Sequence, residues 1–524
     1  MNATSLFRIV ALVVLMTTVV GCAAPAQAPA PAQAPAAAAP TAAPAAPAAT
    51  AVPAVAAPKP LDVIKWDYPP KFNDVTIAVV GDAGHNLKPY EFWKDEFAKA
   101  GITIKIIEVP FEGVYEKEKT EFVAGSGAFD VVTFYPSYIG DFAGNGYLEP
   151  LDDYMKKEPA SVYDPHPEDV LPAFRELYTK YGGKTYALTI DGDAHMLIFR
   201  KDLFANADEQ AAFKAKYGKD LKPPETWDDW LQVGEFFTRK KGEKLAGEVL
   251  NHDFYGSADF GKRGFSYAWW VNRWAANGQP YFDAQMNPQI DSPEAVKALQ
   301  NFVDSLKNSP PDVLAYGYDE LRDALLKGNV AMVVQWTDVP KKGFSPTDSV
   351  VAGKLGQGSV PGLKIGDKVV HAAMMPVGRV VAVAATSKNK DAAYWVAKHI
   401  AYDRSLEDVS TTLDGLDPYR LTHFANPQAY TMFPTQADAQ EYLNGVKAAL
   451  SDGYPDIFIP GAAQYQDALD LHVNKALAGE EKPDAALAAA AKEWDAITDR
   501  LGRDSQIKFW TQAMESYKAV GLIK

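Results

Sequence analysis

The sequence predicts an α/β fold divided between two lobes, and three observations support this prediction. The chain has 524 residues, more than one hydrophobic core usually serves. Strand and helix patterns alternate over residues 75–109, which is typical of a parallel α/β unit. An extended stretch at residues 185–202 is interrupted by Asp191-Gly192-Asp193, as expected where a chain crosses between lobes.

The interrupted stretch is the feature around which the rest of the chain is organised. Its apolar runs at residues 186–190 and 196–199 have strand composition, and Gly192 gives the backbone freedom to bend between them. Such a bend would hold the carboxylates of Asp191 and Asp193 beside a cleft between the lobes. The stretch alone leaves a surface hairpin with an acidic turn open as an alternative.

The composition indicates a folded globular protein, with 47% hydrophobic and 23% charged residues. A net charge of −15 argues against nucleic acid or an anionic membrane surface as the main partner. Cys22 is the single cysteine, which excludes an internal disulfide and a thiolate metal cluster. The histidines are scattered without metal-ligand spacing, so we expect no metal site and no cofactor.

The N-terminus has the features of a lipoprotein leader. An uncharged apolar run at residues 9–20 is too short to span a bilayer comfortably, and it ends in Val19-Val20-Gly21-Cys22. This ending resembles the bacterial lipobox, so residues 1–21 are predicted to be a signal peptide and Cys22 the site of lipidation. A free thiol after an ordinary cleavable leader is the alternative. Residues 22–60 are nearly all Ala and Pro and predict a disordered tether.

The first elements after the tether alternate between strand and helix. Asp82 follows the first strand and Tyr135 the third, at the carboxyl ends where ligands of open α/β sheets bind. The expected strands are residues 75–80, 102–109 and 130–134, and the expected helices are residues 89–100, 115–123 and 139–147.

Beyond residue 202 the patterns are mainly helical. Thr226 and Ser292 are expected helix N-caps. The expected helices are residues 226–237, 265–276, 292–307, 318–327 and 391–400, followed by a largely helical remainder after residue 420. Strands are expected at residues 330–336 and 377–385, so the first lobe is predicted to be discontinuous in sequence.

The order of these pieces resembles the extracellular solute-binding proteins of family 1, the maltodextrin-binding type that serves an ATP-binding-cassette importer. The resemblance rests on the lipobox, Phe129-Asp130-Val131-Val132, the crossing at residues 186–202, Ser292-Pro293-Glu294-Ala295 and Lys327-Gly328-Asn329-Val330. It implies a two-lobed periplasmic-binding-protein-like fold, type II or Venus-flytrap, whose discontinuous lobes are joined by hinge crossings. Residues 71–189 and 340–402 would form the N-terminal lobe, and residues 190–339 and 403–524 the helix-rich C-terminal lobe.

The resemblance also implies the partners. The ligand would be a small solute, a mono- or oligosaccharide in the first place, which the protein delivers to the transmembrane subunits of an importer. The protein would be a monomer, held by its lipid anchor at the extracytoplasmic face of the membrane.

Sugar recognition needs flat apolar faces and groups that bind hydroxyls. By resemblance, Trp336 lines the cleft, one of Trp269 and Trp270 faces the sugar, and Tyr465 supplies a further aromatic. The remaining ligand-binding candidates are Asp82, Tyr135, Asp191, Asp193, Asp338, Arg379 and Asp414.

Parts of the sequence are also compatible with two other functions. Asp191 and Asp193 could be the carboxylate pair of a glycosidase, but the chain lacks the Gly-x-Ser-x-Gly, His-Glu-x-x-His and Walker patterns, and we expect no enzyme. The excess of carboxylates also suits a polyamine, although the supply of aromatic residues favours a sugar.

Overall fold

The computed structural model describes residues 71–157, 167–375 and 378–523. The predicted signal peptide, Cys22 and the tether lie outside these ranges. The described residues all belong to one compact unit. Within the described ranges, every helix is too short or too polar to traverse a lipid bilayer.

The first lobe is built on a five-stranded sheet with the order β2-β1-β3-β16-β6. The parallel pairs β1–β2 and β1–β3 come from the alternating unit at the start of the chain, whereas β16 runs antiparallel to β3 and to β6. The strands are β1 (Val75–Asp82), β2 (Ile102–Val109), β3 (Val131–Phe134), β6 (Ala187–Thr189) and β16 (Val380–Val383). The predicted discontinuity is therefore confirmed, because β16 joins a sheet that begins 300 residues earlier in the chain.

The second lobe contains a four-stranded sheet with the order β10-β11-β7-β12. β10 is parallel to β11, and β7 is antiparallel to both β11 and β12. The strands are β7 (His195–Arg200), β10 (Tyr255–Ala258), β11 (Val330–Trp336) and β12 (Leu355–Gly358). Every residue of β11 is buried, as the apolar run at residues 330–334 predicts for a central strand.

Of the four helices predicted beside the first sheet, three are present and one is interrupted, and α5 and α6 were not predicted. The single helix predicted at residues 89–100 is interrupted at Trp93, whose backbone leaves the helical region and whose indole Nε1 donates to Asp408. The helices are α1 (Lys88–Phe92), α2 (Lys94–Lys99), α3 (Val114–Ala124), α4 (Ile139–Gly144), α5 (Asp152–Lys157), α6 (Pro172–Glu176) and α14 (Lys390–Lys398).

Two helices of the second lobe, α9 and α11, begin at the predicted N-caps. Thr226 forms a capping box with Asp229, and the Ser292 hydroxyl accepts from the Ala295 amide. The helices are α7 (Lys201–Phe204), α8 (Ala207–Tyr217), α9 (Trp227–Phe237), α10 (Ser266–Trp274), α11 (Pro293–Ser305), α12 (Tyr318–Leu326) and α13 (Val339–Gly343).

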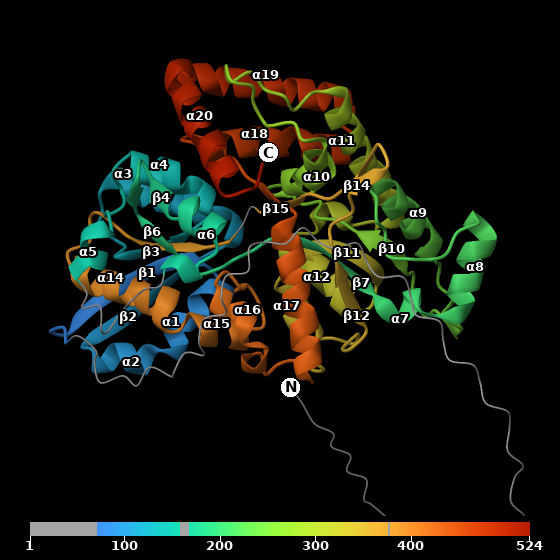
Figure 1. Ribbon diagram of the computed structural model, residues 1–524, viewed down its shortest axis with the longest axis horizontal. Helices are drawn as coiled ribbons and strands as arrows, with labels where there is room; N and C mark the ends of the chain where they lie inside the picture. Colours follow the sequence, from blue (N-terminus) through green and yellow to red (C-terminus); the bar gives the residue numbers. More distant parts are fainter. Residues whose placement is uncertain (1–70, 158–166, 376–377, 524) are drawn as a thin grey trace, which may run out of the picture. The chain divides into compact units, whose positions relative to one another are not determined.

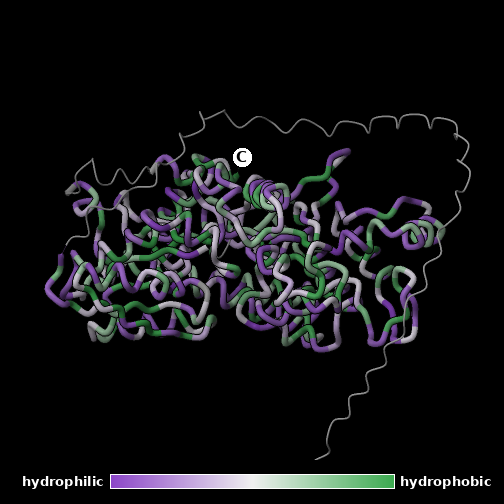
Figure 2. The backbone as a smooth tube through the Cα atoms, turned by 90° about the horizontal axis from the view of Figure 1, so that it is seen from below, coloured by the Kyte–Doolittle hydropathy of each residue, from purple (hydrophilic) through white to green (hydrophobic). Residues whose placement is uncertain are grey.

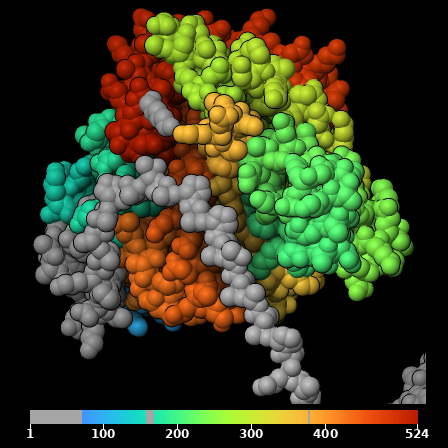
Figure 3. Space-filling view, turned by 45° about the vertical axis from the view of Figure 1, so that its right-hand side comes forward, coloured from blue at the N-terminus to red at the C-terminus, as the bar shows by residue number. Residues whose placement is uncertain are grey.

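The C-terminal part is helical, as predicted. Figure 1 shows α18, α19 and α20 lying together beside α10 and α11, and in Figure 3 the orange segment that includes α17 reaches the surface. The helices are α15 (Ser405–Thr411), α16 (Leu421–Ala425), α17 (Gln436–Ser451), α18 (Ala462–Leu477), α19 (Pro483–Leu501) and α20 (Arg503–Ala519).

Short elements complete the chain. Two-stranded pairs are formed by β4 (Lys180–Tyr181) with β5 (Lys184–Thr185), β8 (Lys244–Leu245) with β9 (Glu248–Val249), β13 (Leu363–Ile365) with β14 (Lys368–Val370), and β15 (Ala373–Met375) with β17 (Gly453–Pro455). The hydrophobic and hydrophilic stretches in Figure 2 alternate along the described chain, which fits elements that each bury one face.

The stretch at residues 191–193 is a crossing between the two sheets and not a hairpin, because β6 and β7 belong to different sheets. Gly192 is needed there for space: a Cβ would lie 2.5 Å from the carbonyl oxygen of Pro418. The predicted lobe boundaries remain predictions. Because β12 pairs with β7 in the second sheet, we expect the boundary predicted at residues 339/340 to lie after β12 instead.

Candidate functional site

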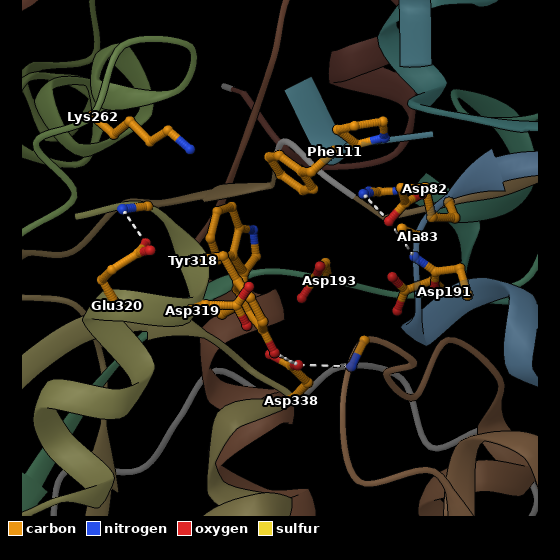
Figure 4. A pocket seen from close by; sticks show the side chains of 16 residues that line it. Asp82, Ala83, Phe111, Asp191, Asp193, Lys262, Tyr318, Asp319, Glu320 and Asp338 are labelled. Carbon is orange, nitrogen blue, oxygen red and sulfur yellow. Dashed lines mark hydrogen bonds and ion pairs between the residues drawn. The ribbon is translucent and has the colours of Figure 1, made fainter. Parts of the chain in front are cut away.

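A cavity of about 280 Å³ lies between the two sheets, beside the crossing at residues 191–193. Figure 4 shows Phe111, Tyr318, Asp193 and Asp338 arranged around it. The lining residues are Asp82, Ala83, Asn86, Pro110, Phe111, Asp191, Asp193, Lys262, Gly317, Tyr318, Asp319, Glu320, Trp336, Asp338, Arg379 and Gly415. Both lobes and the crossing therefore contribute side chains.

An ion pair occupies the first-lobe side of the cavity. The Arg379 guanidinium donates from Nε to Oδ1 of Asp82 at 2.8 Å and from Nη2 to Oδ2 at 3.1 Å. The same Nη2 donates to the Tyr135 hydroxyl at 2.8 Å, and the guanidinium carbon lies 3.8 Å from the centre of the Tyr135 ring. Because β1, β3 and β16 are neighbours in the sheet, the ends of these strands bring the three residues together. The guanidinium is thereby held in one orientation.

Trp336 supplies the apolar wall on the second-lobe side. It is the last residue of β11, and its ring centre lies 5.0 Å from that of Trp269 and 5.6 Å from that of Tyr318. Phe111, on the opposite lobe, approaches to 6.3 Å between ring centres. The Trp336 indole Nε1 is buried and has no hydrogen-bond partner. Aromatic faces and an available donor therefore meet in the cavity.

Asp338 follows β11 and is held from two directions. Its Oδ2 accepts hydrogen bonds from the Tyr318 hydroxyl and, at 2.7 Å, from the Gly415 amide, whereas its Oδ1 is buried without a partner. Burial, with Asp417 and Asp414 as neighbouring like charges, raises the pKa of Asp338 to about 7.

Asp191 and Asp193 lie on the crossing itself, and both line the cavity although they are almost fully buried. Burial raises the pKa of each well above the ordinary value for an aspartate, and the nearby carboxylates add to this effect. Oxygens of Asp191, Asp193 and Asp417 lie within 4.8 Å of one another. The floor of the cavity is thus an acidic cluster.

Six of the eleven candidate residues line the cavity together: Asp82, Asp191, Asp193, Trp336, Asp338 and Arg379. Two more lie beside it. Tyr135 holds Arg379 and faces a neighbouring hollow that also contains Phe111, Tyr138 and Phe265. Asp414 precedes the lining residue Gly415 and forms an ion pair with Lys342 at 2.8 Å.

Trp269, Trp270 and Tyr465 do not line the cavity, whereas one of Trp269 and Trp270 was expected to face the sugar and Tyr465 to supply a further aromatic. The indole of Trp269 packs behind Trp336 and donates to the Val334 carbonyl. Trp270 stacks on Trp274 at 5.1 Å between ring centres, as residues one helical turn apart do. Tyr465 is buried in α18 and hydrogen-bonded to Thr498. These rings have core partners instead.

Several residues that line the cavity were not predicted from the sequence. Phe111 follows β2 and so sits at a strand end, a signal that could have found it. Tyr318, Asp319 and Glu320 form the start of α12, where acidic residues have the ordinary explanation of favourable charge at a helix N-terminus. Asp417 does not line the cavity but contacts Asp191, which does, and it lies more than 220 residues away in the chain, so only the fold brings the two together.

Comparison with known proteins gives one family match and several relatives. The family model described as bacterial extracellular solute-binding protein matches residues 84–401, more than half of the chain. A probable amino-acid ABC transporter periplasmic-binding protein of Sinorhizobium fredii is 24% identical, with 83% of this chain and 92% of that protein covered. The mannitol-binding protein of Pseudomonas aeruginosa is 28% identical, with 56% of this chain and 60% of that protein covered.

Solved structures agree on the fold. An ABC transporter solute-binding protein from Agrobacterium radiobacter in complex with ribitol superposes with a TM-score of 0.67 at 24% identity, covering 82% of this chain and 100% of that one. The maltose-bound T. maritima protein MalE3 superposes with a TM-score of 0.65 at 22% identity, covering 81% and 100%. The predicted two-lobed fold with hinge crossings is therefore confirmed.

Proposed function

Since the chain belongs to the family of bacterial extracellular solute-binding proteins, we propose that its cavity captures a neutral sugar or polyol and that the protein delivers this solute to an ABC permease. The observation that carries the proposal is the pairing of Trp336 and Phe111, from opposite lobes, above a floor of carboxylates. An aromatic face covers the C–H side of a sugar, and carboxylates accept from its hydroxyls.

The relatives support this class of solute, although they do not agree on a ligand. Two solved structures with the same fold as this chain are described with bound ribitol and bound maltose, and one sequence relative is described as a mannitol-binding protein. The Sinorhizobium fredii relative is described as a probable amino-acid binder. The chemistry of the lining residues, and not the names of relatives, therefore carries the choice.

Closure of the lobes is the proposed signal to the permease. A solute that touches Phe111 and Arg379 on one lobe and Trp336 on the other binds the closed arrangement preferentially. A differential affinity of a few kcal/mol moves the population from mostly open to mostly closed. The protein acts as a monomer that binds without turnover, and the lipid on Cys22 keeps it at the membrane.

A cationic solute such as a polyamine is the second candidate, because Asp191, Asp193, Asp319, Glu320 and Asp338 all line the cavity. The two candidates differ in their response to salt. Ions screen carboxylates from a cation, whereas stacking of a neutral sugar changes little with ionic strength.

A thermal-shift screen with ribitol, D-mannitol, maltose, spermidine and glycine tests the proposal, because a ligand that binds only the folded state raises the melting temperature. We expect a shift with ribitol, D-mannitol or maltose. Calorimetry with that compound should then show stoichiometric binding, no products, and little change between low and high salt. A shift with spermidine alone would assign the cavity to cations, and product formation would make the protein an enzyme.

Trp336→Ala should weaken binding of the sugar or polyol by about 1–3 kcal/mol, the contribution of burying one large apolar face. Trp270→Ala is the matched control, since Trp270 lies in the core and outside the cavity. It should lower stability and leave the affinity of the folded protein unchanged. Unchanged affinity in Trp336→Ala would remove this ring from the binding site.

A further inference from the structure

Three aspartates from two distant segments converge beside the cavity, and two of them, Asp191 and Asp193, line it. Asp191 and Asp193 belong to the crossing between β6 and β7, and Asp417 belongs to the segment between α15 and α16. One oxygen of each lies within 4.8 Å of the others. Their residues are 1%, 7% and 0% exposed, so bulk water does not solvate the three carboxylates.

The backbone holds the two segments in register. The Asp417 amide donates to Oδ1 of Asp191 at 2.6 Å, and the Gly192 amide donates to the Asp417 carbonyl at 3.2 Å. The Tyr442 hydroxyl donates to Oδ1 of Asp417 at 2.8 Å. The carboxylates therefore remain close together although like charges repel.

Two carboxylate oxygens in this region are buried and have no hydrogen-bond partner. They are Oδ2 of Asp417 and Oδ1 of Asp338. A buried carboxylate oxygen without a donor is expensive, and a native structure nearly always satisfies such an atom by a proton, a water or an ion. The unpartnered oxygen of Asp417 belongs to one of the three converging side chains. A proton or a cation bound by these side chains would therefore satisfy it.

The basic side chains nearby are bound elsewhere. Arg379 donates to Asp82 and Tyr135. The Lys341 Nζ donates to the carbonyl oxygens of Val409 and Leu416. Among the described residues, no lysine or arginine forms an ion pair with Asp191, Asp193 or Asp417. Arg379 acts on Asp191 only through its longer-range charge, so the three carboxylates are not neutralised by direct ion pairs among the described residues.

We propose that Asp191, Asp193 and Asp417 bind a Ca²⁺ ion that enters from the cavity. Ca²⁺ takes six to eight oxygen ligands at about 2.3–2.6 Å, so two oxygens on one ion lie at most about 5.2 Å apart. The bound of 4.8 Å between the carboxylate oxygens falls within this reach. Mg²⁺ demands a near-ideal octahedron at about 2.0–2.1 Å and gives up its waters reluctantly, so a cluster that offers three protein carboxylates to one ion suits Ca²⁺ better.

The position of the ion has two consequences. It joins the crossing at residues 191–193 to the segment that carries Asp417, so it stabilises the contact between two parts of the hinge. Because Asp191 and Asp193 line the cavity, the open coordination positions face the solute. Hydroxyl groups of a sugar or polyol are oxygen ligands of the kind that Ca²⁺ accepts.

The site is tested on purified full-length protein that has been treated with EDTA and dialysed, without any solute. Addition of CaCl₂ should raise the melting temperature in a saturable manner. Tb³⁺, which replaces Ca²⁺ at oxygen sites, should give luminescence sensitised by Trp336 in the same cavity, and added Ca²⁺ should displace it. Mg²⁺ should compete at least tenfold less well than Ca²⁺.

Asp417→Asn should weaken Ca²⁺ binding at least tenfold. Asp456→Asn is the control: Asp456 is equally buried, but its oxygens accept from the Ile457 amide and from Tyr267 and Gln466, and it does not line the cavity. Its Ca²⁺ affinity should equal that of the unchanged protein. This control separates the cluster from binding at the acidic surface.

No Ca²⁺-dependent shift and no Tb³⁺ signal in the unchanged protein would overturn the proposal and assign charge balance to protons. Equal Ca²⁺ affinity in Asp417→Asn would overturn it as well. If Asp417→Asn does not fold, Asp193→Asn takes its place, since Asp193 is the least buried of the three and lines the cavity. The outcome is independent of the solute screen, because Ca²⁺ binding is measured with no sugar present.

Discussion

On the first-lobe side of the cavity, Asp82 and Arg379 form a bidentate ion pair, whereas on the crossing side Asp191, Asp193 and Asp338 form no ion pair with a lysine or arginine among the described residues. Both sides are equally buried. The first side is complete without a ligand, and its donors and acceptors are fixed before a solute arrives. On the second side, the buried carboxylates need a proton, a cation or a ligand hydroxyl as a partner. Binding of a solute is therefore expected to stabilise the closed protein mainly through this side.

The largest effect is expected from breaking the ion pair on the complete side. Arg379→Met keeps much of the side-chain volume but leaves the Asp82 carboxylate buried without its partner, which should destabilise the protein by about 3–5 kcal/mol. Denaturant unfolding measures this loss. The double variant Arg379→Met, Asp82→Leu removes both charges and should recover most of it. A loss below about 1 kcal/mol in the single variant would contradict a closed ion pair.

The crossing side should appear in the pH dependence of stability. The pKa of Asp338 is about 7 in the folded protein against an ordinary value of 3.8. Between these values the folded state keeps a proton that the unfolded state has lost, so stability falls as pH rises. The slope from this group is at most about 1.4 kcal/mol per pH unit, or about 3 kcal/mol between pH 4.5 and 6.5.

Asp338→Asn should flatten this slope, because its amide oxygen still accepts from Tyr318 and Gly415 but the side chain no longer titrates. Denaturant unfolding at pH 4.5, 5.5 and 6.5 in the presence of EDTA measures the slope. Asp319→Asn is the control, since Asp319 lines the same cavity but its side chain is 67% exposed. Identical slopes in Asp338→Asn and the unchanged protein would show that Asp338 is ionised throughout.

The residues on the first-lobe side and on the crossing side of the cavity also differ in how well the sequence predicted them. Asp82, Tyr135 and Trp336 end strands with clear apolar patterns, so their position at the edge of a sheet follows from the strand itself. Asp191 and Asp193 were found because a Gly bend interrupts an extended stretch. Asp417 and the omitted Tyr318 depend on contacts between distant segments, which no local pattern contains.

Aromatic residues on helices were the least predictable from sequence. Trp269, Trp270 and Tyr465 have the composition of a sugar-binding surface, but the helix rotates each ring into the core, where it packs against Trp336, Trp274 or Phe282. Successive side chains on a helix point in directions that differ by about 100°. Which direction faces the cavity is set by packing of α10 and α18 against each other, and composition cannot specify it.

The smallest effect concerns the backbone that brings the carboxylates together. A Cβ on residue 192 would lie 2.5 Å from the Pro418 carbonyl oxygen and 2.6 Å from Cβ of Tyr419, so Gly192→Ala forces the two segments apart. We expect a loss of about 1–3 kcal/mol, the usual cost of overpacking, and weaker Ca²⁺ binding because Asp417 moves away from Asp191. Denaturant unfolding and the Tb³⁺ titration measure the two effects.

Gly113→Ala is the matched control for this variant, because a Cβ there meets only Val109, at an ordinary contact distance of 3.5 Å. It should change neither stability by more than about 0.5 kcal/mol nor the Tb³⁺ titration. If Gly192→Ala is as stable as the control and binds Tb³⁺ equally well, the segments are not held by close packing at Gly192. The carboxylates would then be brought together by what binds between them, and removal of the ion should separate the segments in the unchanged protein.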